Sequence, residues 1–181
     1  PSVKRITLVD LDPAMTNLGR NYPLLVAMND SAMHHPKLTI INTDGFNFLE
    51  DNQGTYDAII VDLPDPKSVE LGRLYSYEFY KLCYRQLTED GVLITQAGSP
   101  YYAARAFNCI DTTMSASGFT TLPIHNQVIT LGEWGWVMGA KYLTKQQLKT
   151  KVREADVSKI NTRWMNNSTL TLITSFGKPA F

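Results

Sequence analysis

The feature that most constrains the fold is an alternation of short apolar runs with helix-compatible segments along most of the chain. Four runs rich in Val, Ile and Leu are typical of buried strands and span residues 3–9, 38–41, 58–61 and 92–95. Residues 119–124 and 136–142 indicate two later strands. Parallel strands need crossover connections, usually helices, so this spacing predicts an α/β domain with a mainly parallel sheet and helices on both faces.

Local signals place several helix boundaries. Asp12 is a good N-cap, and Pro23 is expected to interrupt the helix that follows it. Ser76 predicts the start of a helix that runs to about residue 87. The sequence Thr-Lys-Gln-Gln at 144–147 predicts a capping box and a final helix. The tail from Asn161 contains a Thr-Leu-Thr-Leu-Ile-Thr alternation that is not assigned to a helix or a strand.

Composition argues against several classes of function. The 181 residues carry 17 basic and 17 acidic side chains, so no excess of positive charge indicates a nucleic-acid partner. No apolar run approaches the length that spans a membrane. The two cysteines and three histidines form no metal-binding motif. We therefore expect no metal site, and a reducing, cytoplasmic location is favoured.

The stretch from Tyr56 to Pro66 is the most suggestive of a site. Its apolar run ends at Asp62, and Asp65 follows three residues later. Pro64 and Pro66 stiffen the turn because proline fixes φ and removes a backbone donor. Two acids at the end of a buried strand suit a ligand site, but Asp and Pro are also ordinary turn residues.

The four early strands are each followed by a polar residue, and these residues are Asp10, Asp44, Asp62 and Gln96. Parallel strands have their carboxyl ends on one edge, where ligands bind, so we expect the four side chains on the same edge. A carboxylate can accept hydrogen bonds from ribose hydroxyls, which suits Asp10. Asp44 suits an adenine amino group, with Gly45 giving the base close access to the backbone. The grouping resembles that of domains that bind an adenosyl sulfonium cofactor or substrate, although the glycine-rich loop and first strand of such domains are missing before Val3.

An ordered set of motifs extends this interpretation. It contains Ile-Thr-Leu-Val-Asp-Leu-Asp-Pro from residue 6, Asn-Thr-Asp-Gly-Phe-Asn-Phe-Leu from residue 42 and Tyr-Asp-Ala-Ile-Ile-Val-Asp-Leu-Pro-Asp-Pro from residue 56. The segments 74–80, 91–96 and 132–136 continue the set in order. Over residues 3–142 the chain resembles the polyamine aminopropyltransferases, the spermidine synthases.

The resemblance implies a Rossmann-like fold and transfer of an aminopropyl group from decarboxylated S-adenosylmethionine to putrescine or a similar amine. The products would be a polyamine and methylthioadenosine, with no tightly bound cofactor. The resemblance implies that Asp62 is the catalytic residue and that the substrate-binding residues are Asp65, Asp10, Asp44, Gly45 and Gln96. It also implies a partial Rossmann-like domain over residues 1–142, with residues 143–181 as the C-terminal helix and tail of the same domain.

The sequence departs from the family pattern at several places. Lys67-Ser68-Val69 follows the acid pair where the family has Gly-Pro, and Ile129 stands in place of a substrate-contacting tyrosine. The N-terminal hairpin domain and glycine loop of the family are absent from these residues. Some relatives with the Asp-Leu-Pro-Asp-Pro motif are fused to an N-terminal membrane domain. We therefore expect this chain to be the C-terminal catalytic part of a longer protein and to be inactive by itself. The sequence leaves open whether the protein forms a homodimer and whether the parent chain has an N-terminal membrane domain.

Two alternatives also remain open. An S-adenosylmethionine-dependent methyltransferase would share the fold and use Asp10 and Asp44 in the same way. A non-catalytic module that binds a nucleoside or a polyamine would need no complete active site. The pair Asp62 and Asp65 favours aminopropyl transfer, because methyl transfer has no general need for two such acids.

Overall fold

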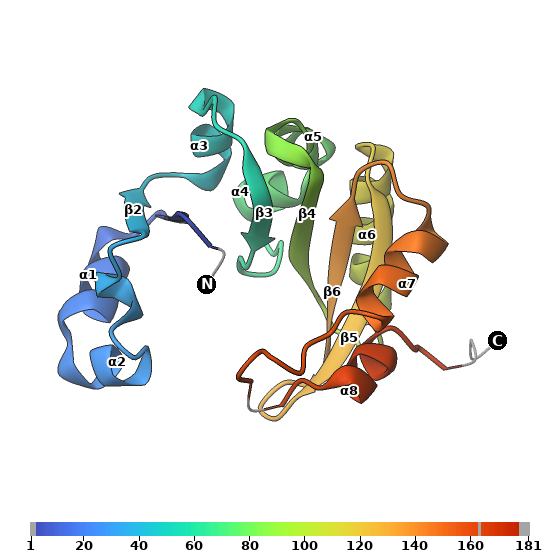
Figure 1. Ribbon diagram of the computed structural model, residues 1–181. Coiled ribbons are helices and arrows are strands. Elements are labelled where there is room, and N and C mark those ends of the chain that lie inside the picture. Colours follow the sequence, from blue (N-terminus) through green and yellow to red (C-terminus); the bar gives the residue numbers. More distant parts are fainter. Residues whose placement is uncertain (1–2, 163, 178–181) are drawn as a thin grey trace. The chain divides into compact units, whose positions relative to one another are not determined.

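The computed structural model describes residues 3–162 and 164–177. The chain divides into two compact units, one ending at Asn52 and the other beginning at Gln53, and each unit is described by itself (Figure 1). The described strands form one sheet in each unit, where the sequence predicted a single sheet. The two sheets are separate because the strands of residues 6–10 and 38–42 pair only with each other, while the strand of residues 56–61 pairs with that of residues 87–98.

The first unit contains a two-stranded parallel sheet. Strand β1 (Ile6–Asp10) pairs with β2 (Leu38–Asn42) in a register that ends with Asp10 opposite Asn42. The helical elements are α1 (Pro13–Asn21), α2 (Pro23–Met28), η1 (Ala32–His34) and α3 (Gly45–Asp51). The predicted N-cap is confirmed, since the Asp12 carboxylate accepts from the backbone N–H of Ala14 at 2.8 Å. The predicted interruption is also confirmed, because Pro23 begins a separate helix.

The second unit contains a four-stranded sheet in the order β3-β4-β6-β5. Its strands are β3 (Tyr56–Val61), β4 (Leu87–Gly98), β5 (Thr120–Val128) and β6 (Gly132–Ala140). Strands β3 and β4 are parallel, whereas β6 runs antiparallel to both β4 and β5. The α/β fold is therefore confirmed, with parallel pairing among the early strands. Strands β5 and β6 are antiparallel because residues 129–131, which join them, are too few for the crossover that parallel strands need.

The helices of the second unit are α4 (Val69–Gly72), η2 (Arg73–Tyr75), α5 (Tyr77–Gln86), α6 (Ala104–Ala116), α7 (Lys145–Arg153) and α8 (Asn167–Ile173). The predicted caps are confirmed at Ser76 and at the Thr144–Gln147 capping box. Strand β4 begins at Leu87, immediately after α5, and so starts five residues earlier than the run at 92–95 suggested. The unassigned alternation in the tail lies in α8, where Asn166 and Thr169 form a second capping box.

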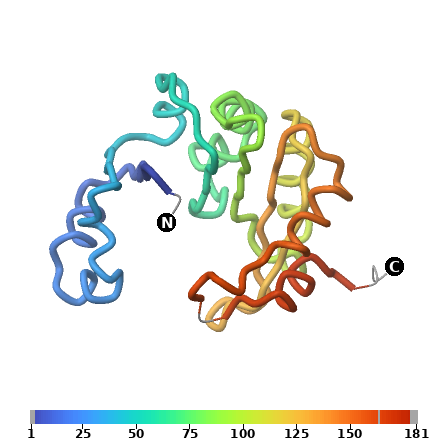
Figure 2. The backbone as a smooth tube through the Cα atoms, in the orientation of Figure 1, coloured from blue at the N-terminus to red at the C-terminus, as the bar shows by residue number. Residues whose placement is uncertain are grey.

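The core of the second unit lies between its sheet and its helices. Helix α6 contacts β4, β5 and β6 and buries Phe107, Ile110 and Met114, which recur at helical spacing. Leu148 of α7 packs with Leu122 and Ala140. Figure 2 shows the C-terminal part of the chain, in orange and red, running against β5. The described part of residues 143–181 thus folds with the four-stranded sheet. No helix of the described ranges is both long enough and apolar enough to cross a membrane.

Candidate active site

The carboxyl ends of β3 and β4 bring three of the predicted site residues to one edge of the four-stranded sheet. The parallel register ends with Val61 opposite Thr95, and the residues that follow are Asp62 and Gln96. Asp62 is exposed, whereas Asp65 is half-buried and Gln96 is buried. The strand register places Asp62 and Gln96 next to each other at this edge, because each comes directly after a residue of the last buried pair. Their role in binding or catalysis stays a prediction.

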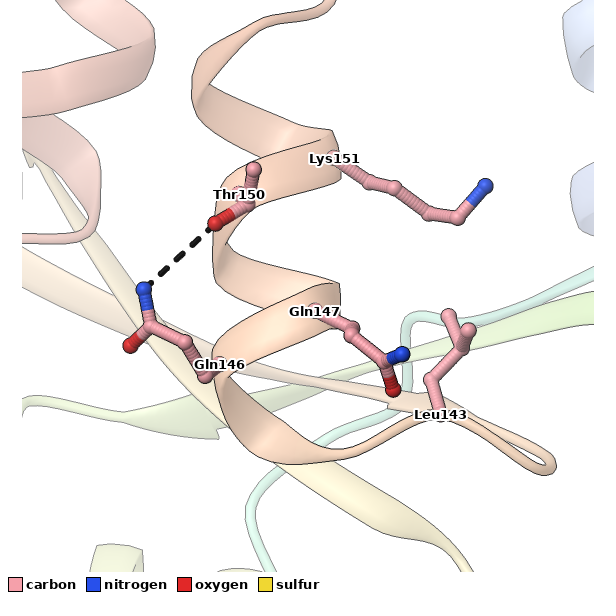
Figure 3. A pocket seen from close by; sticks show the side chains of 5 residues that line it. All are labelled: Leu143, Gln146, Gln147, Thr150 and Lys151. Carbon is pink, nitrogen blue, oxygen red and sulfur yellow. Dashed lines mark hydrogen bonds between the residues drawn. The ribbon is translucent and has the colours of Figure 1, made fainter.

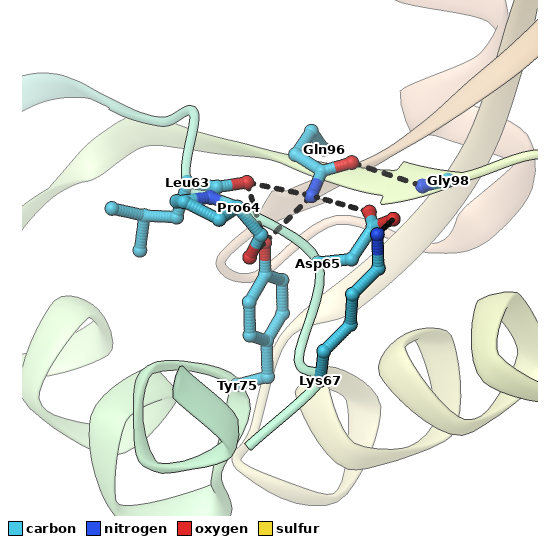
Figure 4. Close-up of polar contacts among 7 residues, drawn as sticks. All are labelled: Leu63, Pro64, Asp65, Lys67, Tyr75, Gln96 and Gly98. Atoms are coloured by element: carbon cyan, nitrogen blue, oxygen red, sulfur yellow. Dashed lines mark hydrogen bonds and ion pairs between the residues drawn. The ribbon is translucent and has the colours of Figure 1, made fainter. Parts of the chain in front are cut away.

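The side chain of Gln96 holds the backbone of the acid-bearing loop, residues 62–66. Its Oε1 accepts from the backbone N–H of Gly98 at 3.0 Å, which turns Nε2 toward the loop. Nε2 then donates to the carbonyl of Leu63 at 2.7 Å and to the Tyr75 hydroxyl at 2.7 Å (Figure 4). A longer contact of 3.4 Å reaches Oδ1 of Asp65. Gln96 is 4% exposed, so these contacts take up nearly all of its hydrogen-bonding capacity.

A shift in strand pairing directs this side chain. The ladder between β4 and β6 is irregular between Gln96 and Gly98, and Gly98 has a φ of +72°. Irregularities of this kind commonly re-aim a side chain next to a functional site, and glycine adopts the positive φ without a steric penalty. The local backbone therefore lets the N–H of Gly98, the last residue of β4, donate to the side chain of Gln96.

The Tyr75 hydroxyl also holds the backbone of the acid-bearing loop. Its hydroxyl lies 3.0 Å from the carbonyl of Leu63 and 3.1 Å from that of Pro64. Burial raises the pKa of Tyr75 to about 12, the hydrogen bond from Gln96 opposes this shift, and the negative charges of Asp65 and Asp62 add to it. The hydroxyl therefore stays protonated at neutral pH and remains a donor to the loop carbonyls.

Lys67 occupies the outer side of Asp65. Its Nζ lies 3.7 Å from Oδ2 of Asp65, and its side chain is largely exposed. The backbone N–H of Lys67 also donates to the Asp65 carbonyl at 2.7 Å, which tightens the turn. The loop thus presents one exposed carboxylate at Asp62 and one partly covered carboxylate at Asp65. Together they form an acidic surface that suits a cation.

The first unit holds Asp10 at the carboxyl edge of its own sheet. Oδ1 of Asp10 accepts from the backbone N–H of Asp12 at 2.7 Å, and the Asp10 carbonyl accepts from Nδ2 of Asn42 at 3.2 Å. The first contact is an Asx-type turn that leads directly into α1. Asp10 therefore has a local structural role in the turn that leads into α1.

Asp44 lies two residues after β2 and caps α3. Its Oδ1 accepts from the backbone N–H groups of Phe46 and Asn47 at 2.9 and 3.0 Å. Gly45 is the first residue of this helix, and a Cβ at this position would meet nothing within 4 Å. Gly45 is thus open on its surface, as close access to its backbone would require. The prediction that Asp10 and Asp44 share one edge with Asp62 and Gln96 stays a prediction, since the two pairs lie in different units.

Sequence reasoning underrated two residues of this site. No role in the site is predicted for Tyr75 from the sequence, yet its hydroxyl contacts the loop between the acids. Lys67 was noted only as a departure from the family pattern, yet it lies beside Asp65. The quoted motif at 74–80 contains Tyr75, but no local pattern indicates which carbonyls a buried tyrosine will meet.

A pocket elsewhere in the second unit lies along α7 (Figure 3). Its lining consists of Leu143, Gln146, Gln147, Thr150 and Lys151. It contains none of the predicted site residues, and Lys151 is its one ionisable side chain. The arrangement offers no acid or base pair, so the candidate site remains the loop at residues 62–66.

Comparisons with known proteins agree with the motifs. The model of the spermine/spermidine synthase domain matches residues 1–151. A polyamine aminopropyltransferase of Ralstonia nicotianae is 41% identical over 140 residues, which are 77% of this chain and 28% of that protein. A polyamine aminopropyltransferase of Oceanobacillus iheyensis is 38% identical over 176 residues, 97% of this chain and 33% of that protein. The chain thus spans about a third of the length of these relatives.

A solved structure supports the fold. A spermidine synthase in complex with the transition-state analogue AdoDATO superimposes with a TM-score of 0.78 at 23% sequence identity. The superposition covers 97% of this chain and 59% of that one. A second spermidine synthase structure, from Thermotoga maritima, gives a TM-score of 0.76.

Proposed function

Because the chain belongs to the spermine/spermidine synthase family, we propose that the protein transfers an aminopropyl group from decarboxylated S-adenosylmethionine to putrescine or a similar amine. The products are a polyamine and methylthioadenosine. The observation that carries the proposal is the loop at residues 62–66, which presents Asp62 and Asp65 and is held by hydrogen bonds with Gln96 and Tyr75. Relatives that match this chain are named polyamine aminopropyltransferases, which supports the same assignment.

The chemistry requires a neutral amine. An alkylamine has a pKa near that of lysine, about 10.4, so removing its proton at pH 7 costs on the order of 4–5 kcal/mol. The carboxylate of Asp62 orients the attacking nitrogen and takes its proton. The nitrogen forms a bond to the aminopropyl carbon, the bond from that carbon to sulfur breaks, and the sulfonium becomes a neutral thioether.

Asp65 holds the other end of the amine. The distal ammonium of a diamine pairs with its carboxylate, and this fixes the distance from the anchored end to the reacting nitrogen. The contact exists before and during reaction, so it contributes to binding more than to the chemical step. Gln96 supports this contact through its long hydrogen bond to Asp65.

We assign the nucleoside part of the sulfonium substrate to the first unit. Asp10 accepts from the ribose hydroxyls, and Asp44 with Gly45 contacts the adenine. The local turns at Asp10 and Asp44 support these roles because they fix both carboxylates at the end of the parallel pair. The sulfonium compound is consumed as a co-substrate and is not a bound cofactor.

We also expect a cytoplasmic location for this part of the protein.

The test is a product assay on the protein in its full natural length. Decarboxylated S-adenosylmethionine and putrescine are expected to give methylthioadenosine and spermidine in equal amounts. Release of S-adenosylhomocysteine from S-adenosylmethionine would instead indicate a methyltransferase. Binding of a nucleoside or amine with no turnover of either sulfonium would indicate the non-catalytic alternative.

A further inference from the structure

The two residues between the acids are held through their backbone carbonyls by buried side chains. Leu63 and Pro64 separate Asp62 from Asp65, and the Tyr75 hydroxyl lies within 3.1 Å of both carbonyl oxygens. The Leu63 carbonyl accepts a second hydrogen bond, from Nε2 of Gln96. Tyr75 is 6% exposed and Gln96 is 4% exposed, so water cannot replace these contacts easily.

The donors and acceptors determine the geometry of this support. A tyrosine hydroxyl has one proton, which two loop carbonyls share, while its oxygen accepts from Nε2 of Gln96 at 2.7 Å. The Gln96 amide cannot rotate freely, because Gly98 donates to its Oε1. Loss of either partner would leave buried polar groups unpaired and release the loop.

We propose that Tyr75 and Gln96 are positioning residues that set the spacing of the Asp62 and Asp65 carboxylates and thereby the length of amine that the protein accepts. The inference rests on the proposed aminopropyl transfer. Neither residue needs to contact the reacting atoms, because Tyr75 acts through the carbonyls of Leu63 and Pro64. Gln96 acts through the Leu63 carbonyl and Oδ1 of Asp65. A diamine anchored at Asp65 reaches Asp62 only when its carbon chain matches the spacing. A misplacement of about 1 Å at a reacting group can cost about a hundredfold in rate.

The experiment compares acceptors of different length in the protein of full natural length. The specificity constant kcat/KM is measured for diaminopropane, putrescine and cadaverine, whose carbon chains increase by one methylene at each step. Tyr75→Phe removes the hydroxyl and keeps the ring. We expect the ratio of kcat/KM between the preferred diamine and its neighbours to fall by about tenfold or more, because the loop no longer holds one spacing.

The ratio is chosen because partial unfolding cannot change it. A fall in the fraction of folded protein lowers kcat/KM equally for all three diamines, whereas a change in spacing alters their relative values. Tyr80→Phe is the matched control: Tyr80 is a fully buried tyrosine of α5, and its hydroxyl makes no hydrogen bond to the described residues 62–66. This control is expected to leave the ratio unchanged.

A second variant keeps the inference testable if Tyr75→Phe folds poorly. Gln96→Met has a similar length without the amide group and is expected to lower the same ratio. The double variant should resemble either single variant, since residues that act as one unit are not additive. An active wild-type protein with an unaltered ratio in Tyr75→Phe and Gln96→Met would overturn this inference alone. Absence of any aminopropyl transfer by the wild-type protein would overturn the proposed function and the inference with it.

Discussion

Nζ of Lys67 lies 3.7 Å from Oδ2 of Asp65, so the carboxylate assigned to the distal ammonium of the amine already faces a cation of the protein. An incoming ammonium must compete with this lysine for the same carboxylate. The competition is modest, because exposed ion pairs contribute about 0.2–1 kcal/mol. Lys67 is therefore expected to weaken amine binding without affecting the chemical step.

Replacement of this lysine gives the first prediction. Lys67→Ala should lower the KM for the amine by up to about fivefold and leave kcat nearly unchanged, and the effect should shrink at high salt. Steady-state kinetics at two ionic strengths measure both quantities. Lys145→Ala, on the exposed surface of α7, serves as the control for a lost positive charge. An unchanged or higher KM in Lys67→Ala would show that the lysine does not compete with the amine.

Tyr75 gives a prediction about alkaline pH. Burial raises its pKa to about 12, whereas an unfolded tyrosine titrates near 10. The protonated Tyr75 hydroxyl therefore makes its full contribution to the free energy of unfolding below about pH 10. That contribution is lost as the pH rises to about 12, because Tyr75 releases its proton at a lower pH in the unfolded chain than in the folded one. Between these values, Tyr75→Phe should lose stability less steeply than the wild-type protein. Denaturant unfolding at a series of pH values tests this, and equal slopes would contradict it.

Gly135 gives a prediction about packing. A Cβ at this position in β6 would come within 2.4 Å of the Phe107 ring and 3.2 Å of the Gly98 carbonyl. Gly135→Ala should therefore lower the free energy of unfolding by about 1–3 kcal/mol, as overpacked cores do. Gly72→Ala is the control, since a Cβ there meets nothing within 4 Å. Equal stability of the two variants in denaturant unfolding would show that the Phe107 ring moves aside at little cost.

Asp10 gives a prediction about the nucleoside. Asp10→Asn keeps an oxygen that can accept from the Asp12 N–H but loses the charge that strengthens hydrogen bonds to ribose hydroxyls. Binding of methylthioadenosine should weaken by about tenfold or more, because hydrogen bonds to charged groups contribute about 1.5–3 kcal/mol. Calorimetric titration measures this change. The control is Asp51→Asn at the end of α3, and equal affinities of the two variants would remove Asp10 from the site.

Local chemistry determined how much of the fold could be predicted from the sequence. The caps at Asp12 and Ser76 and the break at Pro23 depend on residues a few positions apart, so the sequence indicates them directly. The start of β4 at Leu87 was missed because nothing in the sequence separates it from the end of α5. The helix over Asn167–Ile173 was missed because its Thr and Leu residues alternate as in a strand, while the capping box that favours a helix is weaker evidence.

The candidate site was predictable in part for the same reason. Asp62 and Gln96 follow apolar runs, and parallel pairing then brings them to one edge. The contacts of Gln96 with Leu63 and Tyr75 depend on strand register and on the irregularity near Gly98. These features depend on tertiary structure and cannot be predicted from a local sequence pattern. The hydrogen bonds that hold the acid-bearing loop could therefore be identified only in the structure.

The central claim is that Asp62 acts on the reacting nitrogen while Asp65 holds the distal ammonium. Steady-state kinetics on Asp62→Asn and Asp65→Asn, with the amine varied at saturating decarboxylated S-adenosylmethionine, test this claim most directly. We predict that Asp62→Asn lowers kcat and kcat/KM together by about a hundredfold or more, because it removes acid–base catalysis. Asp65→Asn should mainly raise the KM for the amine. A near-normal kcat in Asp62→Asn would contradict the account and return this aspartate to the role of an ordinary turn residue.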